Sequence, residues 1–385
     1  MHILIIPSWY PNSYNKLSGI FFKEQAEAIF DTCNKCKVGV IAPVKIGKKE
    51  FLKKKSINFG KKYNTVNGIP TYIFEYPPII NQENKLVKKI DLFFFIKMFK
   101  DYIKKYGKPD IVHLHSFYSG NLAIYLKENH NIPYILTEHS SAFARKILKH
   151  SEIEYAKDVF RQSSYNIAVS FEFKKLLNNN FSTNFDYIPN MIDSDFFDVF
   201  SKNKKKDFIF INVAFLNPNK KQPMLIKAFY QAFQKKNDVK LIIVGNGPEF
   251  DNLKKLIEEL HMEKQIILYG RANREEIKKL YQQSNAFVLS SQYETFGVVV
   301  IEAMACGLPA ISTKCGGPES IIVSDKLGLL TEINKKDLKD KMLFMYENYV
   351  NYDSSFIQNY VESNFSKKTI TRKIINIYKK VIEND

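Results

Sequence analysis

The hydrophobic positions of this chain gather in short apolar runs, and segments with helical spacing separate the runs. Buried parallel strands form continuous apolar runs, and the helices between them supply the crossovers that such strands need. In the first half, we predict strands at residues 2–6, 38–42, 70–74, 110–114, 134–137 and 165–169. Helices are predicted between several of them, notably over residues 19–30 and 121–129.

The pattern breaks around Ile188-Pro189-Asn190 and over the Lys-rich residues 201–207, which indicates a linker between domains. A second series of the same kind follows. Its predicted strands are residues 208–214, 239–244, 265–269, 286–290 and 310–313, and its predicted helices include 224–235, 249–260 and 275–282. The sequence therefore predicts an α/β protein with two Rossmann-like, doubly wound domains.

Composition agrees with a globular protein of two domains, since the chain has 385 residues, of which 45% are apolar and 25% charged. The net charge of +17 has two interpretations that both stay open: a compositional bias toward Lys, or attraction to nucleotide phosphates, an anionic glycan or a membrane surface. No recognised nucleic-acid motif accompanies the charge, so nucleic-acid binding is a weak alternative.

No apolar run approaches the roughly 20 residues of a membrane span, and residues 1–7 resemble a buried strand more than a signal peptide. We therefore expect a cytoplasmic protein. Four cysteines are present. Cys33 and Cys36 form a C-x-x-C, but Cys306 and Cys315 do not complete a zinc site with them, and we expect reduced thiols.

Two basic stretches lie in the first half. Residues 45–62 are dense in Lys and are predicted to form a mobile loop. Residues 85–106 mix lysines with Phe93, Phe94, Phe95 and Phe99, as a basic amphipathic helix on an anionic membrane does. For the aromatics we favour burial against the sheet, whereas the lysines fit a solvated face and a membrane-facing one equally well.

The segment around Glu294 and Glu302 carries the strongest chemical signal. The two glutamates lie on either side of Gly297, which opens a predicted helix after a strand end. Ligands of open α/β sheets bind at such carboxyl ends. The backbone N–H groups of Phe296 and Gly297 suit a phosphate or a sugar hydroxyl, and a carboxylate at Glu302 suits a bidentate hydrogen bond to ribose.

Together with Gly307, Pro309 and the run Gly316-Gly317-Pro318-Glu319, this segment resembles the C-terminal signature of the retaining glycosyltransferases of family 4, which have the GT-B fold. The resemblance extends over nearly the whole chain. It includes the strand and glycine turn of residues 241–248, the segment 187–193, and the first loop and helix, with Ser8-Trp9-Tyr10-Pro11 and residues 18–26.

The resemblance implies an acceptor-binding domain over residues 1–190 and a domain for the nucleotide sugar over residues 207–366. The helical pattern of residues 367–385 would cross back to the first domain. Glu302 would bind the ribose, Glu294 the donor sugar and Lys220 the departing diphosphate. Gly19 would let backbone approach the phosphates, and no metal or other cofactor is expected.

The resemblance also places His139, at a predicted strand end, beside the transferred sugar. The turn Gly245-Asn246-Gly247 would contact the donor. His113 and His115 are assigned either to structure or to acceptor contacts. One loop departs from the family, because Phe215 stands where Arg is usual and Lys221 where Gly is common. Lys220 would then meet the diphosphate, helped by Lys221 or Arg271.

The sequence thus predicts a metal-independent, retaining transferase that moves a hexose-type sugar from a nucleotide sugar, UDP- or GDP-linked. The expected acceptor is a bacterial surface glycan, such as lipopolysaccharide or capsule, or its lipid-linked precursor. The expected location is the cytoplasm, with an anionic membrane surface as a further candidate partner. A GT-B sugar-nucleotide epimerase is the alternative within the fold. A nicotinamide dehydrogenase is disfavoured, because Ser8-Trp9-Tyr10-Pro11 replaces the G-x-G-x-x-G turn.

Overall fold

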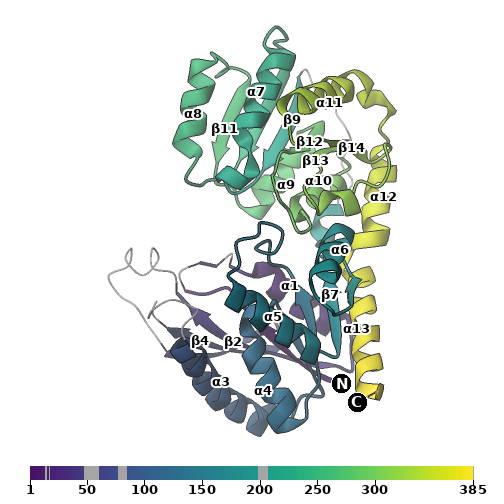
Figure 1. Ribbon diagram of the computed structural model, residues 1–385. Coiled ribbons are helices and arrows are strands. Elements are labelled where there is room, and N and C mark those ends of the chain that lie inside the picture. Colours follow the sequence, from purple (N-terminus) through teal and green to yellow (C-terminus); the bar gives the residue numbers. More distant parts are fainter. Residues whose placement is uncertain (14, 17, 47–59, 77–84, 198–206, 385) are drawn as a thin grey trace. The chain divides into compact units, whose positions relative to one another are not determined.

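The computed structural model describes residues 1–384 except 14, 17, 47–59, 77–84 and 198–206. The chain divides into two compact units (Figure 1). The first contains Met1–Val169, Lys174–Ile188 and Ile370–Asp385, and the second contains Ser170–Phe173 and Pro189–Thr369. Each unit is an α/β structure built on one sheet, which confirms the predicted fold class.

The first unit has a sheet in the order β3-β4-β2-β1-β5-β6-β7-β8, parallel except for β3. Its strands are β1 (His2–Pro7), β2 (Lys37–Lys45), β3 (Gly60–Val66), β4 (Ile69–Tyr76), β5 (Ile111–His115), β6 (Tyr134–Glu138), β7 (Tyr165–Ala168) and β8 (Phe185–Tyr187). Its helices are α1 (Ile20–Thr32), α3 (Lys85–Tyr106), α4 (Gly120–His130), α5 (His150–Gln162), α6 (Phe171–Asn180) and α13 (Lys367–Asn384).

The second unit has an all-parallel sheet in the order β11-β10-β9-β12-β13-β14. Its strands are β9 (Phe208–Val213), β10 (Val239–Val244), β11 (Ile266–Gly270), β12 (Ala286–Leu289), β13 (Ala310–Thr313) and β14 (Gly328–Thr331). Its helices are α7 (Gln222–Phe233), α8 (Phe250–Glu259), α9 (Arg274–Gln282), α10 (Val298–Ala305), α11 (Lys335–Asn348) and α12 (Ser354–Phe365).

The apolar runs form the central strands because helices cover both faces of a parallel sheet. Ile3, Leu4, Ile5 and Ile6 of β1 are all fully buried, as such a strand requires. The short strands β8 and β14 were not predicted. The loop predicted for residues 45–62 was wrong at both ends, since Lys45 ends β2 and Gly60–Val66 forms the antiparallel edge strand β3. Residues 47–59, like most of the predicted linker 201–207, lie outside the described residues.

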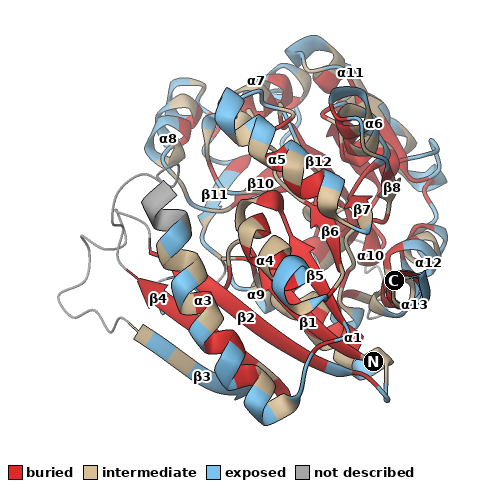
Figure 2. Cartoon of the chain, turned by 60° about the horizontal axis from the view of Figure 1, so that its bottom comes forward, coloured by how far each residue is buried: buried red, intermediate tan, exposed pale blue. Residues whose placement is uncertain are grey.

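Helix α3 has the bounds predicted for the basic segment, and it packs over β2 and β4 (Figure 2). Phe95, Met98, Phe99 and Tyr102 are buried against the sheet, whereas Phe93 is 54% exposed. The predicted burial is thus confirmed for Phe95 and Phe99, whereas Phe94 is only partly buried and Phe93 is exposed. In the part of the chain that the structure describes, no helix is both long enough and apolar enough to span a membrane.

The last helix, α13, belongs to the first unit from Ile370 onward. Its buried residues Ile370, Ile374, Ile377 and Val381 have helical spacing and form one apolar face. Tyr378 on this helix hydrogen-bonds the Nδ1 atom of His113 in β5, at 2.7 Å. The predicted closing helix therefore completes the core of the first unit.

The expectation of reduced thiols at Cys33 and Cys36 was wrong, because the structure joins these residues in a disulfide. They lie in the turn between α1 and β2, where Cys36 N–H donates to Cys33 O at 2.8 Å. This turn brings the two Cα atoms to 5.3 Å, within the range a disulfide can bridge. Cys306 and Cys315 are free, as expected.

Candidate functional site

The second sheet reverses its strand order at β9, which lies between β10 and β12. Open α/β sheets bind their ligands at this switch point, outside the carboxyl ends of the strands. The loop after β9 carries Lys220, and the loop after β12 carries Glu294. Two of the residues singled out in the sequence are thus brought to the same place from positions 74 apart in the chain.

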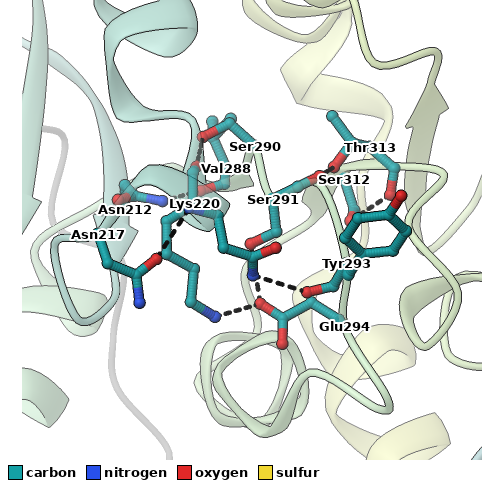
Figure 3. A network of polar contacts seen from close by, with 11 residues as sticks. Asn212, Asn217, Lys220, Val288, Ser290, Ser291, Tyr293, Glu294, Ser312 and Thr313 are labelled. Atoms are coloured by element: carbon teal, nitrogen blue, oxygen red, sulfur yellow. Dashed lines mark hydrogen bonds and ion pairs between the residues drawn. The ribbon is translucent and has the colours of Figure 1, made fainter. Parts of the chain in front are cut away.

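Lys220 and Glu294 form an ion pair, with the Lys220 Nζ atom against Glu294 Oε1 (Figure 3). Ser291 Oγ donates a second hydrogen bond to the same carboxylate oxygen at 2.8 Å. The Lys220 and Glu294 side chains are only 20% and 15% exposed, so solvent screens the pair weakly. The pair therefore places one ammonium and one carboxylate at fixed positions at the sheet edge.

Hydrogen bonds between the two loops hold this pair in position. Ser290 Oγ donates to Lys220 O at 2.8 Å, and Asn219 Nδ2 donates to Tyr293 O at 3.0 Å. In the other direction, Gln292 N–H donates to Asn219 O at 2.7 Å. From the next strand, Thr313 Oγ1 donates to Ser291 O at 2.7 Å. These side chains were missed in the sequence, where a polar residue after a strand is too common to single out.

Gly297 begins helix α10 in a left-handed conformation, with φ 97°. The adjacent Phe296 packs so tightly against Gly317 that a Cβ atom on Gly317 would lie 2.3 Å from Phe296 Cα. The start of α10 is thereby held beside the loop after β13. Glu302 lies within α10, half-buried, with its Oε2 atom 3.5 Å from the Tyr281 hydroxyl.

The turn at Gly245, Asn246 and Gly247 lies against the loop after β9. Cβ atoms on Gly245 and Gly247 would come within 1.9 Å of Ala214 O and 2.1 Å of Leu216 O, respectively, so both positions need glycine. Leu216 N–H also donates to Asn246 O at 3.0 Å. The turn therefore borders the switch point.

Two further positions bear on how the diphosphate would be bound: Phe215, which stands where Arg is usual, and Arg271, a candidate helper of Lys220. Phe215 is 62% exposed in the loop after β9, so its ring does not fill the core. Arg271 is exposed and follows the edge strand β11, with β10 between that strand and β9. The structure thus places Lys220, and not Arg271, against Glu294.

Gly19 and His139 belong to the first unit. Gly19 precedes α1 with φ 62°, and a Cβ atom there would lie 2.4 Å from Trp9 O. His139 follows β6, and its Nε2 atom lies 3.2 Å from Nδ1 of His115. Burial lowers the pKa of His139 and of His113 to about 3, so both imidazoles are neutral at neutral pH.

Glu138 precedes His139 and was missed, because a polar residue at a strand end gives no sign of burial. Its side chain is fully buried. It accepts hydrogen bonds from Ser116 Oγ at 2.6 Å and from the N–H groups of Phe117, His139 and Ser140 at 2.8–3.0 Å. The carboxyl group thus joins the loops after β5 and β6.

Comparison with known proteins gives matches to two family models. The model "Glycosyl transferases group 1" matches residues 193–362, and "Glycosyltransferase Family 4" matches residues 70–196. The uncharacterized glycosyltransferase MJ1178 of Methanocaldococcus jannaschii is 30% identical over 256 residues, 66% of this chain and 69% of that protein. The N-acetyl-alpha-D-glucosaminyl L-malate synthase of Bacillus anthracis is 39% identical over 106 residues, 27% of each chain.

Solved structures share the fold over the full length. The sucrose-phosphate synthase of Thermosynechococcus elongatus superposes with a TM-score of 0.82 and 18% identity, over 100% of both chains. Anabaena HepE, solved with UDP and glucose, superposes with a TM-score of 0.74 and 19% identity, over 99% of this chain and 100% of its own. Both likenesses concern the arrangement of the backbone, which is the predicted GT-B fold.

Proposed function

Because this chain belongs to the group 1 glycosyltransferases of glycosyltransferase family 4, we propose that it transfers a hexose-type sugar from a UDP- or GDP-linked donor with retention of configuration. The observation that carries the proposal is the pair of Lys220 and Glu294 at the switch point of the second sheet. The binding of UDP and glucose by HepE, which has the same fold, supports a donor of this class.

We propose that the ammonium group of Lys220 binds the donor diphosphate and stabilises the negative charge that grows on it as the sugar leaves. Glu294 would accept hydrogen bonds from sugar hydroxyls. The N–H groups of Phe296 and Gly297, at the start of α10, suit phosphate or sugar oxygens. Glu302 would bind the two ribose hydroxyls, as the acidic residue of dinucleotide-binding folds does.

The substrate test begins with a thermal-shift screen against UDP-, GDP- and ADP-sugars, because a ligand that binds the folded state raises its melting temperature. The donor that stabilises the protein is then incubated with acceptor glycans, and the anomeric configuration of the product is read by NMR. We expect retention. Consumption of donor without any acceptor, or an inverted product, would contradict the proposal.

We further propose that transfer needs no divalent metal, since Lys220 supplies positive charge where the diphosphate would bind. Among the described residues, no group of three or more His, Cys, Asp or Glu side chains could hold a metal ion. Turnover is therefore expected to survive excess EDTA. Loss of turnover that Mn²⁺ or Mg²⁺ restores would refute this part of the proposal.

For the acceptor, we propose a bacterial surface glycan or its lipid-linked precursor, reached at the inner face of the membrane. The exposed side of α3 supports this location. Lys89, Lys97, Lys100 and Lys104 lie at helical spacing on that side, with the exposed ring of Phe93 among them. Lys97 Nζ lies 4.3 Å from the centroid of that ring. Such a basic face with one aromatic suits an anionic lipid surface.

Vesicle co-sedimentation tests this location with a matched pair of variants. Replacing the four lysines of the α3 face by Gln should reduce pelleting with anionic vesicles, and pelleting of the wild type should fall as salt rises. The control replaces four exposed lysines of the second unit, which are Lys254, Lys255, Lys264 and Lys279. Equal losses in the two variants, or equal pelleting with neutral vesicles, would refute a specific membrane face.

A further inference from the structure

The first sheet also has a switch point, at β1, which lies between β2 and β5. The loop after β1 carries Trp9, the turn after β5 carries Tyr118, and His139 follows β6. The start of α1 adds Phe21 and Phe22. Aromatic side chains from four segments thus gather where an open α/β sheet binds its ligand.

These side chains contact one another closely. The ring of Trp9 lies 5.2 Å from that of Phe22 and 6.4 Å from that of Tyr118, centroid to centroid. Phe21 lies 4.1 Å from Phe22 and 5.2 Å from His139. Phe22 is fully buried, whereas the other four side chains are partly exposed. We call these five residues the aromatic platform.

Local backbone geometry fixes the platform. The left-handed Gly19 allows α1 to start in contact with the Trp9 loop, where a side chain would collide with Trp9 O. Ser8 Oγ donates to Ser116 O at 2.9 Å and accepts from Ser119 N–H at 3.1 Å, which ties this loop to the turn after β5. The platform is therefore formed without a ligand, so binding should cost little conformational entropy of the protein.

The contacting groups carry no positive charge. Burial lowers the pKa of His115 well below its usual value and that of His139 to about 3, so both rings are neutral. Burial also raises the pKa of Tyr118, which stays protonated. Behind them, the two carboxyl oxygens of Glu138 are occupied by hydrogen bonds from the protein. The rings of these described residues therefore offer a phosphate or carboxylate no cation to offset its desolvation.

Two ring nitrogens in this cluster are buried without a hydrogen-bond partner among the described residues, namely His115 Nε2 and His139 Nδ1. Buried polar atoms are nearly always hydrogen-bonded in native proteins. A ligand hydroxyl can donate to a neutral imidazole or accept from it, depending on the tautomer. Apolar ring faces beside neutral hydrogen-bonding groups match the chemistry of a sugar ring, whose C–H faces are apolar and whose edge carries hydroxyls.

We propose that the aromatic platform is the acceptor subsite and that it takes an uncharged pyranose, stacked on Trp9 and Phe21. This inference rests on the proposed transferase function and adds the chemical class of the acceptor's terminal residue. On this proposal, Trp9, Phe21 and Tyr118 determine the preference for a neutral sugar over a sugar phosphate or a small carboxylate.

Trp9 is the only tryptophan of the chain, so tryptophan fluorescence reports on the platform directly. The intact protein is titrated with the methyl glycosides of glucose, galactose and N-acetylglucosamine, with glucose 6-phosphate and galactose 6-phosphate, with L-malate and with UDP. At least one neutral glycoside should change the emission saturably. The matching sugar phosphate and L-malate should bind at least about tenfold more weakly, a difference of about 1.4 kcal/mol.

The variant Phe21→Leu removes one ring face and keeps the probe, and it should weaken the glycoside by about tenfold. The control Phe344→Leu removes a ring that is 49% exposed in the second unit and should leave binding unchanged. Melting temperatures check that both variants fold. Tighter binding of the anionic probes, equal effects of the two variants, or no emission change with any glycoside up to the order of 100 mM would overturn the proposal.

The same titrations also distinguish a failure of this inference from a failure of the proposed transferase function on which it rests. A nucleoside diphosphate that binds in calorimetry, together with a silent glycoside panel, would remove the platform and leave the transferase intact. An emission change with UDP-glucose that free glycosides do not reproduce would assign the platform to the donor sugar, which also overturns the acceptor assignment.

Discussion

Replacing Lys220 by alanine should lower kcat/KM at least about 100-fold, or roughly 2.7 kcal/mol in transition-state free energy. The Lys220 ammonium is 20% exposed and paired with Glu294, so we treat its surroundings as having an effective dielectric constant of about 20. Two opposite unit charges about 4 Å apart then attract by about 4 kcal/mol. Part of this attraction is already present in the ground state. Only the increase that accompanies charge development on the departing diphosphate accelerates the reaction, so the expected loss of about 2.7 kcal/mol is smaller than the full attraction.

The assay is steady-state turnover of Lys220→Ala with the donor that the thermal-shift screen identifies. Lys221→Ala is the matched control, because it removes a lysine from the next position, which is the left-handed residue before α7. In Lys220→Ala, Glu294 keeps the hydrogen bond that Ser291 Oγ donates to it at 2.8 Å, so the site should stay folded. Melting temperatures of both variants check this. A larger loss of kcat/KM in Lys221→Ala than in Lys220→Ala would show that Lys221, and not Lys220, meets the diphosphate. No loss in either variant would refute the role of this loop.

Three further outcomes are expected. Glu302→Ala should weaken nucleoside diphosphate binding by on the order of 2–4 kcal/mol in calorimetry, and unchanged affinity would remove Glu302 from the site. Gly245→Ala should destabilise the protein by on the order of 2 kcal/mol or more in urea unfolding, because its Cβ would lie 1.9 Å from Ala214 O; a smaller loss would mean that the turn yields. Stability should also fall with pH below about 6.5, since the pKa of buried His113 is lowered to about 3 and the unfolded chain therefore binds its proton first. Between pH 6.5 and 5, one such imidazole contributes a loss of at most about 2 kcal/mol, and unfolding free energies that do not fall over this range would contradict its burial as a neutral group.

The central strands and their helices could be predicted because strands that are buried on both faces appear in the sequence as continuous apolar runs. Residues 239–244 and 310–313 were predicted with the bounds that the structure shows. The edge strand β3 has no such apolar run, since most of its residues are exposed and polar, as suits the edge of a sheet. Its Lys-rich start therefore resembled a loop.

The candidate site was predicted in part. A glycine after a strand end marks a ligand-binding loop, so Gly245, Gly297 and Glu302 could be singled out from local pattern alone. The contact of Lys220 with Glu294 depends on β9 and β12 being neighbours in the sheet, which chain order does not reveal. The platform around Trp9 was missed for the same reason. The disulfide depends on the turn that brings Cys33 and Cys36 together, which spacing alone left open.

The assignment of α13 to the first unit has a consequence for synthesis on the ribosome. The segments of that unit before residue 189 emerge first, but Tyr378, the hydrogen-bond partner of His113, follows about 190 residues later. At roughly 5–20 residues per second, this delay lasts on the order of 10–40 seconds. During that time the nascent first unit lacks the apolar face of α13, so the part of its core that this face covers is exposed to water. The second unit, by contrast, is complete before the last helix leaves the ribosome.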